Sequence, residues 1–406
     1  MVRVVQKFGG TSLADIEHIR NAARRAVAEV KAGNEVAVVV SAMGGMTDQL
    51  IDWVHGVSGR DDSAEYDSVV SAGEQISSGL LALAIEKLGV SSRSWTGWQV
   101  PVATDATHAK ARIRQLDVTK ILQDLKSGTI PVLAGFQGVG PDGRVTTFGR
   151  GGSDTSAVAL AAALDAERCD IFTDVEGVFT SDPRIVPKAR KLERITYEEM
   201  LELASQGAKV LQTRAVALAM KHRVRLQVLS SFFSTPGTLV VGEKEIVEQE
   251  IVSGIAYSRD EAKITLVKVP DQPGVAATIF GPLAEANINV DMIVQNFSED
   301  GSATDLTFTV TRSDFDRALE LIQGRKESIN YQTLIPDLHV AKISVIGVGM
   351  RSHVGVAQQM FQTFAEKGIN IQVISTSEIK VSVLIAEGHT ELALRALHSA
   401  YGLDAS

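Results

Sequence analysis

The first 230 or so residues alternate between short apolar runs and segments with helical periodicity. Val36–Val40 is apolar at every position, which is typical of a strand buried on both faces of a sheet. Leu13–Lys31 instead repeats apolar residues every three or four positions, which predicts an amphipathic helix. This alternation indicates a mostly parallel sheet covered by helices. Further strands are expected at Val2–Phe8, Ile130–Ala134, Cys169–Thr173 and Leu226–Leu229, and further helices at Tyr66–Lys87, Thr155–Ala166, Thr196–Ser205 and Ala208–Lys221.

Cap residues mark the ends of two predicted helices. Ser12 followed three residues later by Asp15 fits a capping box at the start of the first helix, and Gly33 is expected to end that helix. Thr196 with Glu199 predicts a second capping box.

The pattern changes near Ser230, and the rest of the chain contains an internal repeat. A turn-rich stretch and the charged connector Glu243–Glu250 precede two similar segments at a constant offset of 81 residues, as between Gly274 and Gly355. A constant offset indicates a duplicated folding unit, here of strand, helix, strand, strand and helix. The second copy ends without a last strand. We therefore expect Ile251–Tyr257, which precedes the first copy, to complete the second and interleave the two.

Composition narrows the class of protein. The chain has 406 residues, 45% hydrophobic and 22% charged, and a net charge of −9, which argues against general nucleic-acid binding. A single cysteine, Cys169, leaves no internal disulfide and no cysteine-based metal site. We find no leader peptide and no apolar window of transmembrane length, so we expect a soluble, cytoplasmic protein that binds neither membrane nor nucleic acid.

The strongest candidate for chemistry is the stretch 147–154, TFGRGGSD, at a predicted loop-to-helix junction. Glycines here let backbone N–H groups approach an anion, and the helix start adds partial positive charge. Arg150 can bind a carboxylate or phosphate through two parallel hydrogen bonds, and Asp154 can pair with an ammonium group. The alternative is a glycine turn in which Ser153 or Asp154 merely caps the helix.

A second candidate is the turn KFGGTS at residues 7–12, between the first strand and the first helix. Gly9 and Gly10 permit a tight turn with exposed N–H groups, and Lys7 adds a positive charge, which suits a phosphate. The lysine precedes the glycines, so this is not a P-loop. A purely structural turn is the alternative.

Several other loops carry polar residues after predicted buried strands. Ser41 and Thr47 could offer hydroxyl groups to a substrate, although Thr47 could instead cap a helix. Glu74 lies in a largely apolar helix and could simply face water. Asp174 could contact a ribose or a metal-bound phosphate, and Lys209 a phosphate, or Lys209 could be an ordinary surface lysine.

Other patterns carry no such chemistry. Gly138–Gly143 matches Gly-x-Gly-x-x-Gly, but its Pro-Asp-Gly favours a hairpin turn over a dinucleotide site. The eight histidines show no metal-ligand spacing, so we expect no protein-bound metal.

Together, KFGGTS, SAMGGMT at 41–47, AGEQ at 72–75 and FGRGGSD at 148–154 resemble the amino-acid kinase family. FTDVEGVFTSDPR at 172–184 and GAKV at 207–210 extend the resemblance to its aspartokinases, and the repeat resembles their paired ACT domains. The resemblance implies a three-layer α/β/α amino-acid-kinase fold at 1–245. It implies a regulatory lobe at 246–406, with interleaved βαββαβ ACT domains at about 263–338 and 339–406, the latter completed by 251–257. The implied reaction is phosphorylation of L-aspartate by ATP with Mg²⁺ carried by the nucleotide.

The resemblance also implies residue roles. Lys7 and Asp154 are the expected catalytic residues. The aspartate pocket would comprise Ser41, Thr47, Glu74 (for the α-ammonium), Arg150 (for a carboxylate), Gly151, Gly152 and Ser153. The ATP site would comprise Lys7, Phe8, Gly9, Gly10, Thr173, Asp174, Thr180, Asp182, Arg184 and Lys209.

Feedback inhibition by lysine plus threonine is implied on family grounds. The first ACT domain would bind effector through Asp271, Gln272, Pro273, Gly274, Val275, Ala276, Asn289, Val290, Asp291 and Gln295. The second would use Asn370, Ile371, Ser377 and Glu378. The alternative is that these are plain turn and strand residues. A homo-oligomer, dimer or tetramer, through the ACT domains is expected. Some close relatives also make the regulatory lobe as a separate subunit from an internal start. Here the connector around Val247 is where such a start would lie, and the protein sequence does not show whether it is used.

Two rival functions stay open from sequence. One is a kinase of the same superfamily that acts on glutamate or an N-acetylated acid. Arg150 together with Glu74 favours a free amino acid over an N-acetylated one, and the paired ACT domains favour aspartate. The other is a non-catalytic amino-acid sensor with a vestigial front domain, against which the intact Lys7, Arg150 and Asp154 argue.

Overall fold

The computed structural model describes residues 2–59, 61–208, 210–246, 250–297 and 303–404. These form two compact units that are discontinuous in sequence. The first comprises 1–178, 191–204 and 209–248, and the second comprises 179–190, 205–208 and 249–406. The domain boundaries expected at residues 245 and 246 stay a prediction.

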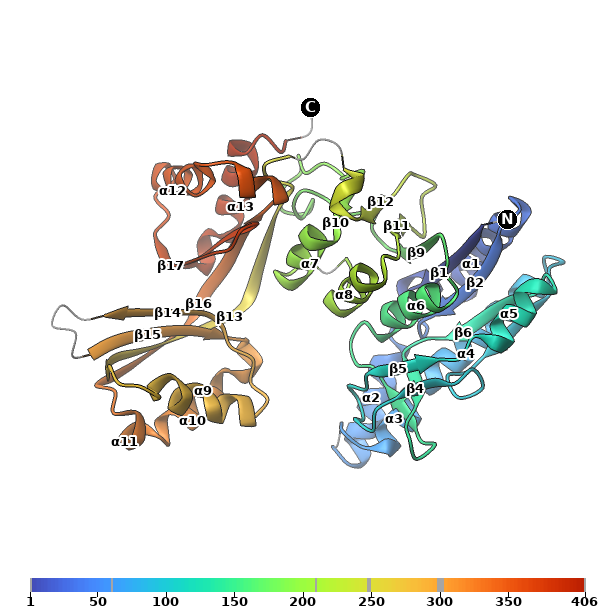
Figure 1. The fold of residues 1–406 in the computed structure, drawn as a ribbon, viewed down its shortest axis with the longest axis horizontal. Helices are drawn as coiled ribbons and strands as arrows, with labels where there is room; N and C mark the ends of the chain where they lie inside the picture. The colour runs from blue at the N-terminus through green and yellow to red at the C-terminus, as the bar shows by residue number, and fades with distance from the viewer. Residues whose placement is uncertain (1, 60, 209, 247–249, 298–302, 405–406) are drawn as a thin grey trace. The chain divides into compact units, whose positions relative to one another are not determined.

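The first unit contains an eight-stranded, mostly parallel sheet with strand order β10-β12-β11-β9-β1-β2-β6-β3 (Figure 1). Only the β11–β12 pair is antiparallel among the pairings described for this sheet. Its strands are β1 (Arg3–Phe8), β2 (Glu35–Val40), β3 (Ser92–Trp95), β6 (Ile130–Ala134), β9 (Arg168–Thr173), β10 (Arg194–Thr196), β11 (Leu226–Ser230) and β12 (Thr238–Val241).

Helices cover both faces of this sheet, as predicted. Val36, Val38 and Val40 join the core formed by helices α1 and α4. The alternate residues Ala37 and Val39 are equally buried, and α6, on which α8 packs, lies against β1, β2 and β9. The helices are α1 (Ile16–Lys31), α2 (Met46–Val57), α3 (Ala64–Val70), α4 (Ala72–Glu86), α5 (Thr119–Lys126), α6 (Gly152–Ala163), α7 (Tyr197–Ser205) and α8 (Thr213–His222).

A smaller four-stranded sheet, of order β5-β4-β7-β8, stands beside α3 in the same unit. Strands β7 and β8 form an antiparallel hairpin around 140–144, so the Gly-x-Gly-x-x-Gly match is a hairpin turn, as predicted. The strands are β4 (Val102–Thr104), β5 (Ile113–Leu116), β7 (Gln137–Val139) and β8 (Val145–Thr147).

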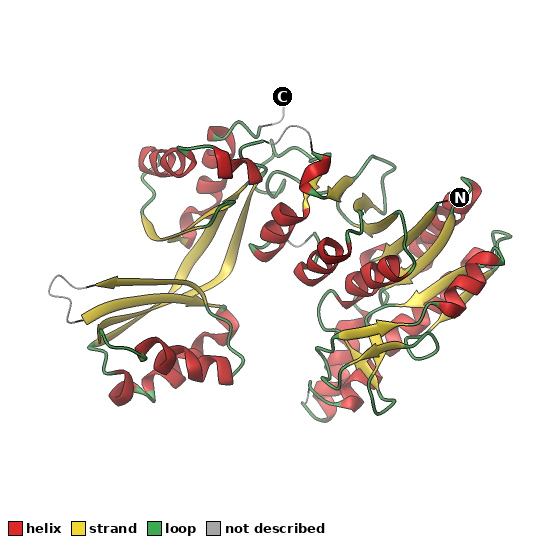
Figure 2. Cartoon of the chain, viewed as in Figure 1, coloured by secondary structure: helices red, strands yellow, loops and turns green. Residues whose placement is uncertain are grey.

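The second unit is built on a six-stranded antiparallel sheet of order β14-β15-β13-β16-β18-β17. Figure 2 shows the strands in yellow and the helices in red. The strands are β13 (Gly254–Pro270), β14 (Asp291–Phe297), β15 (Ala303–Val310), β16 (Thr333–Ile346), β17 (Ile371–Thr376) and β18 (Lys380–Ala386). The helices are α9 (Val275–Glu285), α10 (Phe315–Gln323), α11 (Lys326–Ile329), α12 (Val356–Glu366) and α13 (Thr390–Ala400).

The expected interleaving of the two ACT domains is confirmed by strand β13. Its first part pairs with the end of β16, as in Gly254 with Ile346, beside the strands of the second ACT domain. Its later part pairs with β15 of the first ACT domain, as in Ala262 with Val310. Register shifts near Glu261 separate the two parts.

One of the two predicted capping boxes needs correction. Helix α1 begins at Ile16 and its N-cap is Asp15, so the Ser12–Asp15 capping box is wrong. The Ser12 hydroxyl instead contacts the Phe172 carbonyl and the Ser231 hydroxyl, which are distant in sequence. The box at Thr196 and Glu199 is confirmed by reciprocal side-chain to backbone hydrogen bonds.

One segment differs from the expectation on apolar windows. Residues 64–86 are long and apolar enough to cross a membrane by length and composition alone. Half of this segment is buried inside the protein, and its buried residues include Asp67 and Glu74. These features are those of a core helix pair, α3 and α4, in a folded domain.

Candidate active site

The candidate residues at the start of the chain lie at the carboxyl ends of neighbouring parallel strands. Lys7 is near the end of β1, Ser41 directly follows β2, and Thr173 ends β9. Because β1 pairs in parallel with both β2 and β9, these ends meet at one edge of the sheet. Ligands of open parallel sheets bind at this edge.

Lys7 and Asp154 form an ion pair at this edge. The Lys7 Nζ lies 2.6 Å from Oδ1 of Asp154, and the two side chains are only 11% and 9% exposed. Asp154 is in the first turn of α6, where the helix dipole favours a negative charge. Among the described residues, Oδ1 makes this ion pair and no directional hydrogen bond.

Close approaches of neighbouring atoms explain two of the glycines. A Cβ on Gly10 would lie 3.3 Å from the Ala42 carbonyl oxygen, so the KFGG turn and the loop after β2 touch through their backbones. Gly151 has φ +71°, and a Cβ there would lie 1.9 Å from Cγ of Gln212. Gly151 is also the N-cap of α6, so the alternative in which Ser153 or Asp154 is the cap is wrong.

Glu74 is an almost completely buried carboxylate with one oxygen unused. Its Oε1 accepts a hydrogen bond of 3.0 Å from the backbone N–H of Ala42. Its Oε2 is buried and has no hydrogen-bond partner within the described part of the chain. Burial raises the pKa of Glu74 to about 8, although the Ala42 N–H favours the charged form. Such an oxygen suits a cationic ligand, and Glu74 does not face water.

The other expected aspartate-pocket residues lie on three neighbouring segments. Ser41 donates its backbone N–H to the Phe8 carbonyl. Thr47 is in the first turn of α2, whose N-cap is Gly45, so Thr47 is not the cap. Arg150 is exposed beside the start of α6, whereas Ser153 is buried. Gly152, the first residue of α6, is buried as well.

Residues expected at the nucleotide site divide between the two compact units. Gly9 and Gly10 follow β1, and Phe8 is buried with its ring stacked on Phe172 at 4.7 Å between centroids. Thr173 donates its hydroxyl to Asp174 at 3.1 Å, at the end of β9. Lys209 lies outside the described residues.

Thr180, Asp182 and Arg184 belong to the second unit. Oγ1 of Thr180, which is fully buried, lies 2.8 Å from Nε2 of His398, and Nδ1 of His398 lies 2.8 Å from Asp404. Asp182 pairs with Arg184 at 2.8 Å, and the Arg184 hydrogen bond holds the pKa of Asp182 below its usual value. All the catalytic, substrate and nucleotide roles stay predictions.

The expected effector residues of the first ACT domain surround the start of α9. Gly274, with φ +93°, is the N-cap of α9, and Asp291 begins β14. Oδ2 of Asp291 already pairs with Nζ of Lys342 at 2.6 Å, and Lys342 also pairs with Glu261 at 2.7 Å. Asp271, Gln272, Pro273, Ala276, Asn289 and Gln295 are exposed, Val290 is half-buried and Val275 is buried.

In the second ACT domain, Asn370 precedes β17, which begins at Ile371. Ser377 and Glu378 lie in the turn between β17 and β18, and Ser377 donates its N–H to the Lys380 carbonyl at 2.8 Å. The effector roles of both sets stay predictions.

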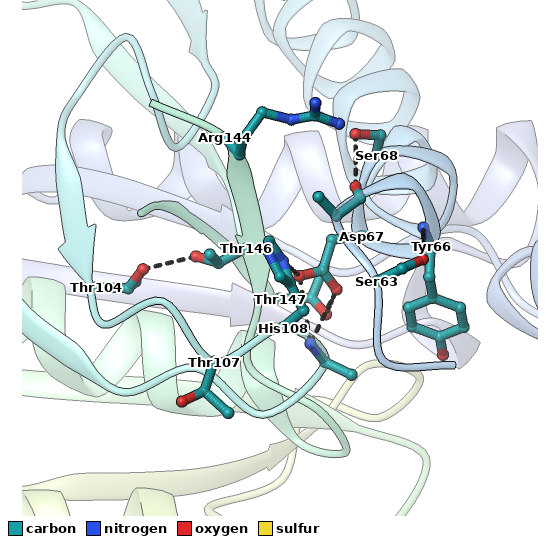
Figure 3. Close-up of polar contacts among 12 residues, drawn as sticks. Ser63, Tyr66, Asp67, Ser68, Thr104, Thr107, His108, Arg144, Thr146 and Thr147 are labelled. Atoms are coloured by element: carbon teal, nitrogen blue, oxygen red, sulfur yellow. Dashed lines mark hydrogen bonds and ion pairs between the residues drawn. The ribbon is translucent and has the colours of Figure 1, made fainter. Parts of the chain in front are cut away.

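The sequence analysis missed a buried network centred on Asp67, in which His108 and Thr147 take part (Figure 3). Its members lie 41 and 80 residues from Asp67, so no local spacing connects them. The segment that leads to AGEQ also contains Glu65 and Ser68, so nothing local marks Asp67 as different from its polar neighbours. The described residues also contain no group of three or more His, Cys, Asp or Glu side chains that could hold a metal ion.

Comparison with protein families gives three matches. Residues 2–230 match the amino acid kinase family. Residues 263–326 and 343–401 each match the ACT domain.

Similar proteins cover the full chain. An aspartate kinase of Stutzerimonas stutzeri is 54% identical over 406 residues, which is 100% of this chain and 98% of the relative. An aspartokinase of Mycolicibacterium smegmatis is 50% identical over 408 residues, which is 99% and 97% of the two chains. The solved structure of Escherichia coli aspartokinase III in complex with aspartate and ADP is 26% identical, with a TM-score of 0.82 over 98% of this chain and 99% of that one.

Proposed function

The chain belongs to the amino acid kinase family, as an aspartate kinase followed by two ACT domains, and from this premise we propose its reaction and its machinery. The γ-phosphoryl group of ATP passes to the side-chain carboxylate of L-aspartate, giving 4-phospho-L-aspartate and ADP. This step opens the routes to lysine, threonine, methionine and isoleucine, and takes place in the cytoplasm.

The observation that carries the choice of substrate is the unused, buried oxygen of Glu74. An amino-acid ammonium placed there would satisfy Oε2 and remove the cost of an unpaired buried carboxylate. Arg150 would bind a carboxylate group of the same molecule in two parallel hydrogen bonds. Ser41, Thr47 and the Gly151–Ser153 turn would complete the pocket. An amino acid with an additional carboxylate could pair its ammonium with Glu74 and a carboxylate with Arg150, and still present its other carboxylate to the phosphoryl group.

The chemistry in this site is electrostatic. The aspartate side chain, with a pKa of ~3.9, is already ionised at neutral pH, so attack on the phosphoryl group needs no general base. The barrier comes from bringing an anion to a polyanion. Lys7 and the backbone N–H of Gly10 would neutralise the transferring group, and Asp154 would hold Lys7 in position. The N–H of Gly9 donates to the Phe172 carbonyl at 3.4 Å, so Gly9 would serve by allowing the tight turn.

The nucleotide would be bound by Thr173, Asp174, Thr180, Asp182, Arg184 and Lys209, together with Phe8 of the first turn. Mg²⁺ would be carried by the ATP phosphates and neutralise part of their charge. Mg²⁺ is usually held by substrate phosphates and only one or two carboxylates.

The test traps the acyl phosphate with hydroxylamine in reactions with Mg-ATP and one acid at a time. We expect hydroxamate with L-aspartate and little with L-glutamate or N-acetyl-L-glutamate. A preference for either of the latter would replace aspartate with another small acid. Amino-acid binding by calorimetry with no turnover on any of the three would favour the sensor function.

We further propose that lysine and threonine inhibit the enzyme through the ACT domains. A solved structure of E. coli aspartokinase III, 26% identical with a TM-score of 0.77, is a complex with lysine and aspartate. The N–H groups near Gly274 would take the effector carboxylate, and Asp291 its ammonium. Because Asp291 is already paired with Lys342, the effector ammonium has to displace the Lys342 ammonium or bind Asp291 beside it. Equilibrium dialysis of each amino acid, alone and together, tests this; binding of neither contradicts it.

The oligomeric state follows as a related proposal. Pairing of ACT domains between copies would give a homodimer or a tetramer. A separately made regulatory subunit would start near Val247, which lies outside the described residues. Native mass spectrometry of the untagged protein tests both points, and full-length monomer as the only species would contradict both.

A further inference from the structure

A fully buried carboxylate, that of Asp67 on α3, receives hydrogen bonds from two other segments of the first unit (Figure 3). Its Oδ2 lies 2.7 Å from Nδ1 of His108. The backbone N–H of Ala109 donates to both carboxylate oxygens, at 3.1 and 3.2 Å. The hydroxyl of Thr147 donates to Oδ1. Asp67 therefore joins α3 to the 108–109 loop and to the end of β8.

The side of this network formed by Thr147 leads directly to Arg150. The Ala111 N–H donates to the Thr147 carbonyl at 2.9 Å. A Cβ on Gly149 would lie 2.9 Å from the Ala109 carbonyl oxygen, so the loop lies against the backbone just before Arg150. Arg214 holds the same two segments together, donating to the Phe148 carbonyl at 3.1 Å and to the Ala111 carbonyl at 2.7 Å.

The other side of the network leads to Glu74. The Asp67 carbonyl accepts the N–H of Ser71 at 3.1 Å, at the junction between α3 and α4. The Ser71 carbonyl in turn accepts a 2.9 Å hydrogen bond from Nε2 of Gln137, which is buried on β7. Glu74 follows in the first turn of α4. The network therefore reaches both residues expected to hold the charged groups of the amino acid.

We propose that Asp67 is a positioning residue that sets the separation between Glu74 and Arg150, and thereby the selection of an acid that carries both an α-ammonium and an α-carboxylate. This inference rests on the proposed function of those two residues. A buried carboxylate costs desolvation free energy, and all three residues that hydrogen-bond to it come from the segment before Arg150 or the loop packed on it. Asp67 itself is too deeply buried to touch substrate.

The first experiment compares Asp67→Asn with Asp124→Asn. Asp124 is a matched control in the same unit, because it is also buried and binds Arg93 and Trp95 on β3. We expect Asp67→Asn to raise the KM for aspartate about tenfold, with the KM for ATP changed by less than about twofold, since a small displacement of a substrate-binding group is enough for such a loss. Asp124→Asn should leave both KM values unchanged.

A second readout separates positioning from a general loss of structure. Succinate lacks the α-ammonium and 3-aminopropanoate lacks the α-carboxylate. Asp67→Asn should lower the preference for aspartate over both, whereas a purely structural defect would reduce turnover of all three acids equally. A folded Asp67→Asn enzyme with an unchanged aspartate KM and unchanged preference would overturn the proposal.

Two further measurements test the proposal if Asp67→Asn does not fold or if the enzyme does not phosphorylate aspartate. If Asp67→Asn does not fold, Thr147→Val removes one donor at nearly constant shape and should shift the same KM by a smaller factor. If the natural enzyme does not phosphorylate aspartate, the proposed function fails on its own. Amide hydrogen exchange then tests the network directly: Asp67→Asn, unlike Asp124→Asn, should accelerate exchange both at 147–152 and at 72–75. Unchanged exchange at both segments would overturn the inference.

Discussion

The Lys7 ammonium lies 2.6 Å from the carboxylate of Asp154, so one ion pair connects the end of β1 to the first turn of α6. These two residues are 147 positions apart in sequence, and each adjoins a different glycine-rich turn. Because the pair is nearly covered, the attraction is stronger than for a surface pair. The pair lies at the edge of the sheet where we expect the phosphate to bind.

Lys7→Ala is expected to lower kcat by a factor of about 10²–10³, because one charge that stabilises the transferring phosphoryl group is lost and Asp154 is left unpaired. Hydroxamate formation at saturating ATP and aspartate measures the effect. Lys120→Ala is the control, since Lys120 is bound to the Gln99 carbonyl at the surface. Loss of activity in both variants to the same degree would remove the assigned role of Lys7.

The KM for aspartate is expected to fall as pH rises from 6 to 8. Burial raises the pKa of Glu74 to about 8, so the free enzyme carries a neutral Glu74 through most of this range, and an ammonium needs the charged form. Well below that pKa, affinity should rise about tenfold per pH unit. KM measured across this range, in a constant ionic-strength buffer, is the readout. Glu74→Gln should have a high KM without this slope, and an equal slope in the variant would exclude Glu74 as its source.

The same residue is expected to cost stability in the absence of substrate. The folded pKa of about 8 lies above the ordinary glutamate value of 4.5, so the folded state binds the proton more tightly. Its contribution is most favourable at low pH and is lost as pH rises from 4.5 through 8. Glu74→Gln should therefore be more stable than the natural protein at pH 8.5, by about 1–3 kcal/mol, with a smaller gap at pH 6. Urea unfolding at both pH values measures this difference in unfolding free energy. A difference that becomes smaller as pH rises from 6 to 8.5 would contradict the prediction.

Gly151→Ala and Gly143→Ala should differ although both positions have positive φ, +71° and +77°. A methyl group on Gly143 meets nothing within 4 Å, so only the backbone strain of about 1–2 kcal/mol is expected. A methyl group on Gly151 overlaps Gln212 and displaces the turn that carries Arg150 and Asp154. We expect kcat/KM for aspartate to fall at least about tenfold in Gly151→Ala only. Equal activities at matched folded fractions would show that the turn tolerates displacement.

Local sequence patterns correctly predicted the elements that depend on interactions between residues close in sequence. The apolar run Val36–Val40 is a strand buried on both faces, and the Thr196–Glu199 box caps its helix, because alternation and capping act over a few residues. Where a distant segment competes, the prediction failed: the Ser12 hydroxyl contacts Phe172 and Ser231 in place of capping α1.

The helix expected over Tyr66–Lys87 shows the same limit. It starts at Ala64 and is divided into α3 and α4 at Ser71. The Ser71 carbonyl is held by Gln137, a contact that no periodicity within the segment records. Motif resemblance identified Glu74, but its unused oxygen and its proximity to Ala42 became evident only from the folded chain.

The long strand β13 makes the second unit a single cooperative element. Its residues near Gly254 complete the sheet of one ACT domain, and those near Ala262 complete the sheet of the other. Because both domains share this strand, we expect them to unfold together. The segment 179–190 belongs to the same unit through the Thr180–His398 contact and through Val186 in its core. Heat or denaturant that unfolds either ACT domain is therefore expected to release Asp182 and Arg184 as well. A ligand that stabilises either ACT domain should likewise stabilise the segment 179–190, which precedes both domains in the sequence.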